Sequence, residues 1–182
     1  MKTYDILSTK ERYKVLDYIL NRPEEEFKVR DISRKIKLSP SHVSKTLKIL
    51  KKEGIIKNNK LNRESPLVKS LKILINIKKL DDIKLVKISR RTIKNVIGIG
   101  VYGSWVSGTN YEDSDLDIWI KSEKPIKEPE VAKLNSYLIK KLKMDVSILT
   151  LWPEKIDKLK KDNVFYHSLV FGSFVLWGEG ID

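Results

Sequence analysis

The chain has 182 residues, a length that allows one domain or two small ones. Hydrophobic residues make up 41% and charged residues 34%, so there is enough apolar material for a core and the chain is not mainly disordered. The absence of cysteine excludes disulfides, zinc–thiolate sites and cysteine nucleophiles, and with two histidines a histidine-rich metal site is not expected. No apolar run has the ~18–20 residues of a membrane span, and no signal peptide is evident. We therefore expect a cytoplasmic protein that does not bind membranes.

The net charge of +13 is distributed unevenly along the chain. Residues 1–97 hold 26 Lys and Arg against 11 Asp and Glu, a net +15, whereas residues 98–182 carry a net −2. This asymmetry suggests a front half that binds a polyanion, joined to a part with another function. A lysine-rich composition that only solvates the surface remains the alternative explanation of the charge.

The first part of the chain predicts two helices in succession. Ser8 and Glu11 have the spacing of a capping box, with Ser8 as the N-cap. Apolar residues then recur at helical spacing until Pro23, which ends the first helix. A second helix is predicted over residues 29–37, where two isoleucines lie four residues apart.

A third helix follows a tight connection and carries the most informative pattern. Ser39 can cap it, Pro40 suits its first position, and Gly54 fits the position just past its end. One stripe of this helix is polar and basic, with members at i, i+3, i+4, i+7 and i+11: Ser41, Ser44, Lys45, Lys48 and Lys52. Small hydroxyl residues followed by lysines suit a helix in the major groove of DNA. The alternative is a docking or dimerisation module with a solvated lysine face.

A short hairpin is predicted after the third helix, with strands at 55–57 and 61–63 and a turn between them. The order helix, helix, turn, helix, hairpin resembles the winged helix-turn-helix domains of prokaryotic regulators. This resemblance covers about residues 5–66, and it implies a DNA-binding domain over residues 1–66.

Residues 67–93 are interpreted as a linker region. The pattern predicts one helix over 67–79, ended by Asp81 and Asp82, and a second short helix between residues 83 and 94. The apolar face of the first helix is too wide for a lone surface helix. We expect it to pack between domains or against a second copy of the chain, so a homodimer stays open.

The back half begins with a predicted buried strand over residues 96–102, rich in β-branched residues and glycines. The strand runs into Gly103 and Ser104, and a short helical turn follows. A strand that ends in Gly-Ser at a helix start presents backbone N–H groups and a hydroxyl to an anion.

A second strand is predicted over residues 114–120, with Asp115 and Asp117 on one face and Leu116, Ile118 and Ile120 on the other. The two carboxylates are adjacent and repel each other. A divalent cation removes this conflict, and oxygen ligands of this kind suit Mg²⁺. Trp119, two residues after Asp117 on the same strand, is interpreted as a packing residue rather than a platform for a nucleotide base.

A third carboxylate follows on another predicted strand. A helix is predicted over 128–143, then a strand over 144–149 that places Asp145 on the same kind of face as Asp115 and Asp117. Residues 165–177 predict a closing helix and strand. Three carboxylates from two strands, together with a Gly-Ser loop, are typical of phosphoryl transfer.

This arrangement resembles the nucleotidyltransferase superfamily of DNA polymerase β. The residues that carry the resemblance are Gly103-Ser104, ten residues later Asp115-x-Asp117, and then Asp145. The spacing is similar to that of the minimal nucleotidyltransferases of archaea and bacteria. Some of these have a fused helix-turn-helix, and some pair with HEPN toxins that they neutralise by adenylylation. The resemblance implies an α+β domain over residues 94–182, with a small mixed sheet flanked by helices.

The resemblance also implies roles for individual residues. Asp115, Asp117 and Asp145 would hold Mg²⁺, and Asp145 would help to deprotonate the acceptor hydroxyl. The backbone of Gly103 and Ser104, with the Ser104 hydroxyl, would hold the phosphates of ATP.

Three hypotheses about function follow from the sequence. The leading one is transfer of AMP from ATP to a hydroxyl of a partner protein, with a HEPN-type protein as one candidate, by a chain that also binds DNA. The second is a DNA-binding regulator that senses a nucleotide without catalysis. An antibiotic-modifying enzyme fits less well, because little in the sequence suggests an acidic pocket for a cationic drug.

Overall fold

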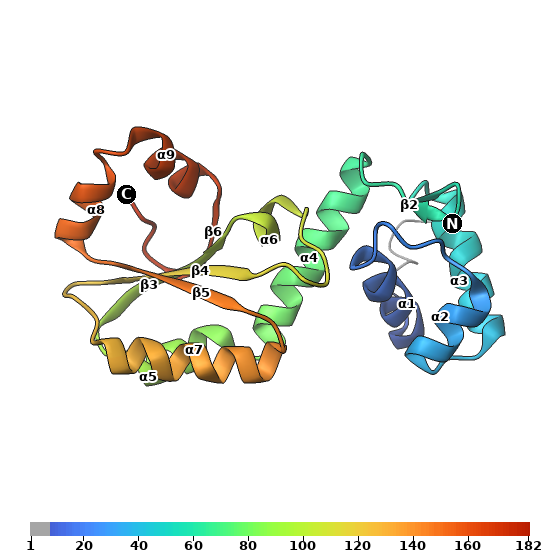
Figure 1. The fold of residues 1–182 in the computed structure, drawn as a ribbon, viewed down its shortest axis with the longest axis horizontal. Coiled ribbons are helices and arrows are strands. Elements are labelled where there is room, and N and C mark those ends of the chain that lie inside the picture. The colour runs from blue at the N-terminus through green and yellow to red at the C-terminus, as the bar shows by residue number, and fades with distance from the viewer. Residues whose placement is uncertain (1–7) are drawn as a thin grey trace. The chain divides into compact units, whose positions relative to one another are not determined.

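A computed structural model of the chain describes residues 8–182 (Figure 1). The described residues form two compact units, and the boundary between them falls between Lys72 and Ile73, inside helix α4 (Pro66–Asp82). Each unit contains its own set of buried apolar residues. Among residues 8–182, none of the helices combines the length and the apolar composition that a membrane span needs.

The first unit consists of three helices and a two-stranded hairpin, as the sequence predicts. Its elements are α1 (Lys10–Leu20), α2 (Val29–Ile36), α3 (Pro40–Lys52), β1 (Ile56–Lys57) and β2 (Lys60–Leu61). The core lies between the helices and includes Val15, Leu16, Ile19, Val43 and Leu50, all fully buried. These residues sit at helical spacing on α1 and α3, so the periodicity of the sequence is the reason why the helices face one another.

The predicted capping box at α1 is wrong by one residue. Thr9 is the N-cap, and its hydroxyl accepts a hydrogen bond from the backbone N–H of Arg12 at 3.2 Å. Ser8 instead accepts from the Arg12 guanidinium at 2.9 Å. With Thr9 as the N-cap, Glu11 occupies the second helical position, one residue short of the place from which a capping box closes.

The other predicted turns of the first unit are confirmed. Ser39 caps α3, Pro40 occupies its first turn, and Gly54 follows its end with φ +70°. Asn58 and Asn59 connect β1 and β2 with φ +52° and +60°. Two successive residues with positive φ make the tight turn whose twist matches that of a β-hairpin, and asparagine tolerates this conformation.

The second unit is a four-stranded mixed sheet with helices on both faces. After α4 its elements are α5 (Leu85–Thr92), β3 (Val96–Tyr102), α6 (Ser104–Ser107), β4 (Leu116–Ser122), α7 (Glu128–Leu142), β5 (Val146–Leu151), α8 (Pro153–Leu159), α9 (Asn163–Phe171) and β6 (Ser173–Gly178). The strand order is β5-β4-β3-β6. β3 pairs antiparallel with β4 and β6, whereas β4 and β5 are parallel. The predicted α+β class with a small mixed sheet is confirmed.

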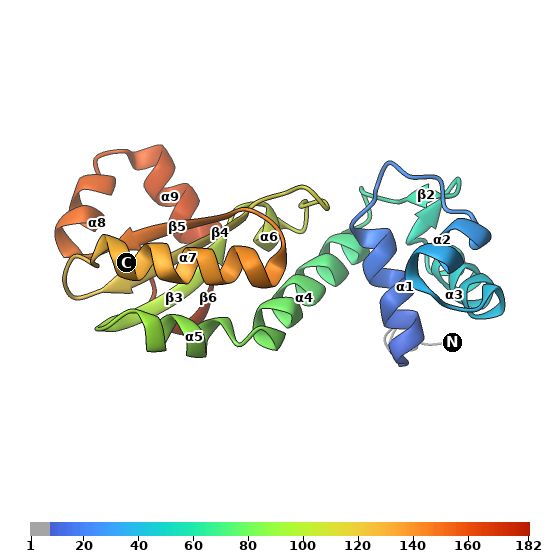
Figure 2. The same ribbon diagram turned by 60° about the horizontal axis from the view of Figure 1, so that its bottom comes forward.

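The two faces of this sheet are covered by different helices (Figures 1 and 2). On one face, Leu116, Ile118 and Ile120 of β4 are fully buried in a core that includes residues of α4, α5 and α7. On the other face, Trp119 packs with residues of α8 and α9. The sequence patterns do not predict α8, whereas the closing helix and strand, α9 and β6, are confirmed.

Candidate active site

The end of β3 turns sharply at Gly103 into the short helix α6. Gly103 has φ +71°, a conformation that residues with a side chain rarely adopt. A Cβ on Gly103 would also lie 2.8 Å from Oδ2 of Asp117. Glycine is therefore required here for two separate reasons, and its backbone lies directly against the Asp117 carboxylate.

Ser104 follows at the start of α6 and is half-buried. Its carbonyl accepts hydrogen bonds from the backbone N–H of Thr109 and the hydroxyl of Ser107. Its own hydroxyl makes no hydrogen bond to any residue in the part of the chain that the structure describes. The predicted Gly-Ser turn is thus present, with a hydroxyl available for a ligand.

Asp117 lies on β4 opposite Tyr102 of β3, in the register of the antiparallel pair. The flanking Leu116 and Ile118 are fully buried on the other face, so alternation along the strand directs Asp117 away from that core. Asp115 lies one residue before the strand begins and is exposed, whereas Asp117 is half-buried. The predicted placement of these two carboxylates on one face is consistent with this geometry.

Two neighbouring side chains of the site, Asp117 and Tyr102, have raised pKa values. Partial burial raises the pKa of its carboxyl above the ordinary value, and the charge of Asp115 raises the pKa further. The pKa of the Tyr102 hydroxyl is raised as well, first by burial and then by the charge of Asp117. The anionic form of Asp117 is therefore disfavoured as the site stands, and a cation beside it would relieve that cost.

Asp145 immediately precedes β5, the strand parallel to β4. Its carbonyl accepts a hydrogen bond from the backbone N–H of Leu116 at 3.0 Å, and Asp117 stands opposite Ser147 in the register. The chain thus brings Asp145 beside Asp115 at the beginning of the two parallel strands. Asp145 is exposed, like Asp115.

The three aspartates offer the donor set that Mg²⁺ prefers, carboxylate oxygens on neighbouring strands. The charge of Asp115 adds to the effect of burial in raising the pKa of Asp117, so these two carboxylates repel each other. Within residues 8–182, however, no three Asp, Glu or His side chains gather tightly enough to form a metal-binding group. The backbones of these three residues lie on or just before neighbouring strands, but their carboxylates do not converge on one metal position.

A pocket of about 580 Å³ opens beside Gly103. It is lined by Tyr102, Gly103, Val106 and Ser107 on one side and by Phe165, Ser168, Leu169, Phe171 and Gly172 on the other. Its size is in the range of small-molecule sites. Sequence patterns miss the contribution of α9 to this pocket, because nothing in its apolar pattern indicates which part of the sheet it covers.

Trp119 is a core residue, as predicted, and it lies on the same face of the sheet as Asp117. It is fully buried, and its indole N–H donates to the Ser173 hydroxyl at 3.1 Å. Its ring lies so close to β3 that a Cβ on Gly100 would be 2.3 Å from it. Along β4, the accessible part of this face therefore lies at the end that carries Asp115 and Asp117.

In the first unit, the stripe of α3 predicted to bind DNA lies on the side away from the core. Ser41, Lys45, Lys48 and Lys52 are exposed and Ser44 is half-buried. The opposite side of the helix carries the buried Val43, Leu47 and Leu50. This stripe is available to a ligand, and its role in DNA binding stays a prediction.

The comparisons with known proteins agree with the division into two units. Residues 9–58 match the family model described as bacterial regulatory protein, arsR family. No curated protein matches the chain.

Similar solved structures belong to toxin–antitoxin systems. A mutant of the MntA–HpeT toxin–antitoxin is 23% identical, over 53% of this chain and 72% of that one, with a TM-score of 0.44. A toxin–antitoxin structure with AMP-PNP is 24% identical, over 55% and 75%, with a TM-score of 0.45. A tri-AMPylated Shewanella oneidensis HEPN toxin in complex with MNT antitoxin is 20% identical, over 59% and 73%, with a TM-score of 0.40. At these values, none of these structures defines a substrate or a partner for this chain.

The second unit contains the match that assigns the family. Residues 82–173, just over half of the 182-residue chain, match the family model described as polymerase beta, nucleotidyltransferase. The chain therefore belongs to this family of nucleotidyltransferases.

Proposed function

We propose that the chain transfers AMP from ATP to a hydroxyl of a partner protein and that its first unit binds DNA. The observation that carries the transfer reaction is the contact between the Gly103 turn and the Asp117 carboxylate, with Asp115 close enough to raise the pKa of Asp117. A loop that can hold phosphates thus stands directly beside the carboxylates that the chemistry needs.

Each part of the site has a task in this reaction. The backbone around Gly103 and the free Ser104 hydroxyl would hold the phosphates of ATP. Asp115, Asp117 and Asp145 would hold Mg²⁺, which when bound neutralises charge on the phosphates. The acceptor oxygen forms a bond to the α-phosphorus while the bond to the β-phosphate breaks and pyrophosphate leaves. The hydroxyl proton passes to the exposed carboxylate of Asp145.

The pocket beside Gly103 supports a nucleotide as the donor. Its volume of about 580 Å³ suits a small molecule, and the aromatic rings of Phe165 and Phe171 can pack against a base. The second unit is small, with little room for a separate body that would bind a folded RNA. We therefore favour a protein as the acceptor, with a HEPN-type partner implied by the family resemblance.

The transfer is tested with purified chain, Mg²⁺, α-labelled ATP and a purified HEPN-type partner. We expect label on the partner and release of pyrophosphate, both lost in Asp117→Asn. Asp113→Asn is the matched control, since Asp113 is an exposed residue of the loop before β4. Binding of ATP without any labelled partner or pyrophosphate would favour the nucleotide-sensing regulator instead.

DNA binding by the first unit rests on the exposed stripe of α3. Lys45→Ala with Lys48→Ala should weaken binding to the chain's target DNA and reduce its salt dependence by about one unit of slope per lost phosphate contact. Lys14→Ala with Lys69→Ala removes the same charge from exposed positions outside the stripe. An equal loss of DNA affinity in the two double variants would show that binding depends on the net charge of the chain and not on the α3 stripe.

A further inference from the structure

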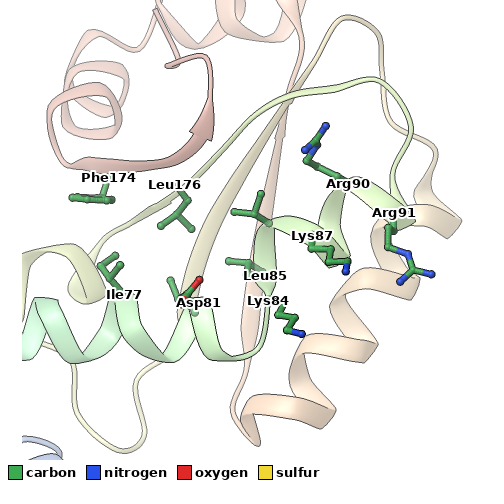
Figure 3. Close-up of a pocket in the computed structure, with 11 residues that line it drawn as sticks. Ile77, Asp81, Lys84, Leu85, Lys87, Arg90, Arg91, Phe174 and Leu176 are labelled. Atoms are coloured by element: carbon green, nitrogen blue, oxygen red, sulfur yellow. The ribbon is translucent and has the colours of Figure 1, made fainter.

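A second pocket lies on the face of the sheet opposite to Asp117. Its volume is about 720 Å³, and it is formed by the end of α4, by α5 and by β6 (Figure 3). Several of the residues that line it, Leu80, Leu85, Ile77 and Leu176 among them, also belong to or pack against the core that α4, α5 and α7 cover. The reaction proposed above uses none of these residues.

The lining of this pocket is apolar on one side and cationic on the other. In Figure 3, Phe174 and Ile77 lie on one side of the pocket and Lys87 and Arg91 on the other, with Leu176 and Leu85 between them. Lys84, Lys87 and Arg91 are exposed, and none of them has an ion pair with a residue among those the structure describes. The lining contains one acid, Asp81.

The fourth cation is held in place by an aromatic ring. The guanidinium carbon of Arg90 lies 4.0 Å from the centre of the Trp177 ring. Arginine and exposed aromatic residues are enriched where proteins meet partners. The apolar side of the pocket also reaches the outer strand of the sheet, β6, where Phe174 remains 45% exposed.

We propose that this pocket is the docking site for an acidic amphipathic helix of a partner protein. Lys87 and Arg91 lie four residues apart on α5, about 6 Å along its axis, and Lys84 is the residue just before the helix. A second helix presents carboxylates over the same length on one of its faces. Its apolar face then packs on Phe174, Leu176 and Val86, in the manner of helix-in-groove recognition.

Charge complementarity favours this occupant over others. Four cations and one acid border this apolar pocket, so an acidic partner is attracted there, whereas the same pocket of a second copy would bring like charges together. Because the pocket and Asp117 lie on opposite faces of the sheet, a docked helix leaves the aspartates uncovered. The inference goes beyond the proposed transfer reaction and does not depend on it.

The test measures fluorescence anisotropy of two labelled helical peptides with the full chain. Both peptides have leucines at i, i+3, i+4 and i+7, and one has glutamates and the other lysines between them. The glutamate peptide should bind and the lysine peptide should not. Lys87→Glu with Arg91→Glu should weaken binding about tenfold or more, because two attractions become repulsions. Lys133→Glu with Lys140→Glu, on exposed positions of α7, is the control with the same change of net charge.

A second variant tests the apolar half of the pocket. Phe174→Ala should weaken binding of the glutamate peptide several-fold, and its circular dichroism spectrum shows whether it still folds. Equal losses in the two charge-reversal pairs, or no binding of the glutamate peptide, would overturn the proposal. Tighter binding to phosphatidylglycerol vesicles than to the peptide would also overturn it, as would a dimer of the chain that Phe174→Ala dissociates.

Discussion

The two faces of the four-stranded sheet carry opposite chemistry. The face covered by α8 and α9 holds Asp117 and, at its end, the Gly103 turn. The face covered by α5 and α7 is apolar on β4 and bordered by Lys84, Lys87, Arg90 and Arg91 at the pocket beside β6. The strand β4 serves both, because alternate residues of one strand face opposite sides. The comparison teaches that the negative charge needed for chemistry and the positive charge suited to a partner can be separated by the thickness of one sheet.

The largest expected effect comes from removing the charge of Asp117. Asp117→Asn keeps the shape of the side chain and removes its capacity to hold a divalent cation, so nucleotidyl transfer should fall by about 100-fold or more. The measurement is the rate of pyrophosphate release. Lys87→Glu with Arg91→Glu, on the other face, should leave Mg²⁺-dependent binding of ATP unchanged, whereas Asp117→Asn should abolish it. An equal loss of ATP binding in both variants would contradict the separate roles of the two faces.

The Gly103 turn should be the next most sensitive position. Gly103→Ala forces a strained φ of +71° on alanine and places its Cβ 2.8 Å from the Asp117 carboxylate. We expect a loss of about 1–3 kcal/mol in the free energy of unfolding, together with loss of transfer activity. Gly54→Ala is the matched control, since Gly54 has φ +70° and a Cβ there would meet no atom within 4 Å. If both substitutions lower the free energy of unfolding by the same amount, the close approach to Asp117 adds nothing to the cost of Gly103→Ala.

A substitution at Gly100 tests the packing of β3 against Trp119, on the face of the sheet that carries Asp117. A Cβ at Gly100 would lie 2.3 Å from the Trp119 ring, so Gly100→Ala should destabilise the second unit by about 1–3 kcal/mol through overpacking. Urea unfolding followed by tryptophan fluorescence measures the loss. The double variant Gly100→Ala/Trp119→Leu removes the ring that the new methyl group meets, and it should cost less than the two single changes together.

The smallest expected effect is on pH dependence. Burial and Asp115 raise the pKa of Asp117 in the folded chain, so the folded state binds the proton more tightly than the unfolded state. The free energy of unfolding should therefore fall as pH rises from the ordinary pKa of an aspartate through the raised value. Because Asp117 is only partly buried, solvent screening keeps this loss below about 1 kcal/mol. Without Mg²⁺, Asp117→Asn should be more stable than the wild type near neutral pH and equal to it in acid.

Much of this arrangement follows from local sequence patterns. Alternation along residues 114–120 is sufficient to separate Asp115 and Asp117 from the leucine and isoleucines of the core, and the Gly103-Ser104 turn is explicit in the sequence. Helical spacing likewise predicts the buried side of α3. These features depend on periods of two or 3.6 residues, which a short window contains.

What could not be predicted depends on contacts between distant segments. Trp119 shares the strand face of Asp117, and its packing role was predicted, but the segments that bury it, α8 and α9, could not be identified from the sequence. Lys121 lies on the same strand and suits a phosphate contact by its charge, but it donates to the carbonyl of Gly180 at 2.8 Å and pairs with Glu179. The cap of α1 is a local exception, since Ser8 and Thr9 are both suitable N-caps and it is the Thr9 hydroxyl that reaches the N–H of Arg12. The contacts of Trp119 and Lys121 join segments far apart in the chain, so they leave no local signal.

The central claim is that Gly103, Ser104, Asp115 and Asp117 form one site for a nucleotide and a divalent cation. Calorimetric titration with each of the four nucleoside triphosphates, with and without Mg²⁺, tests it most directly. We predict Mg²⁺-dependent binding of ATP that is lost in Asp115→Asn/Asp117→Asn and kept in Asp113→Asn. Binding that is equal in the wild type and the double variant, or no binding of any of the four nucleotides, would contradict the claim.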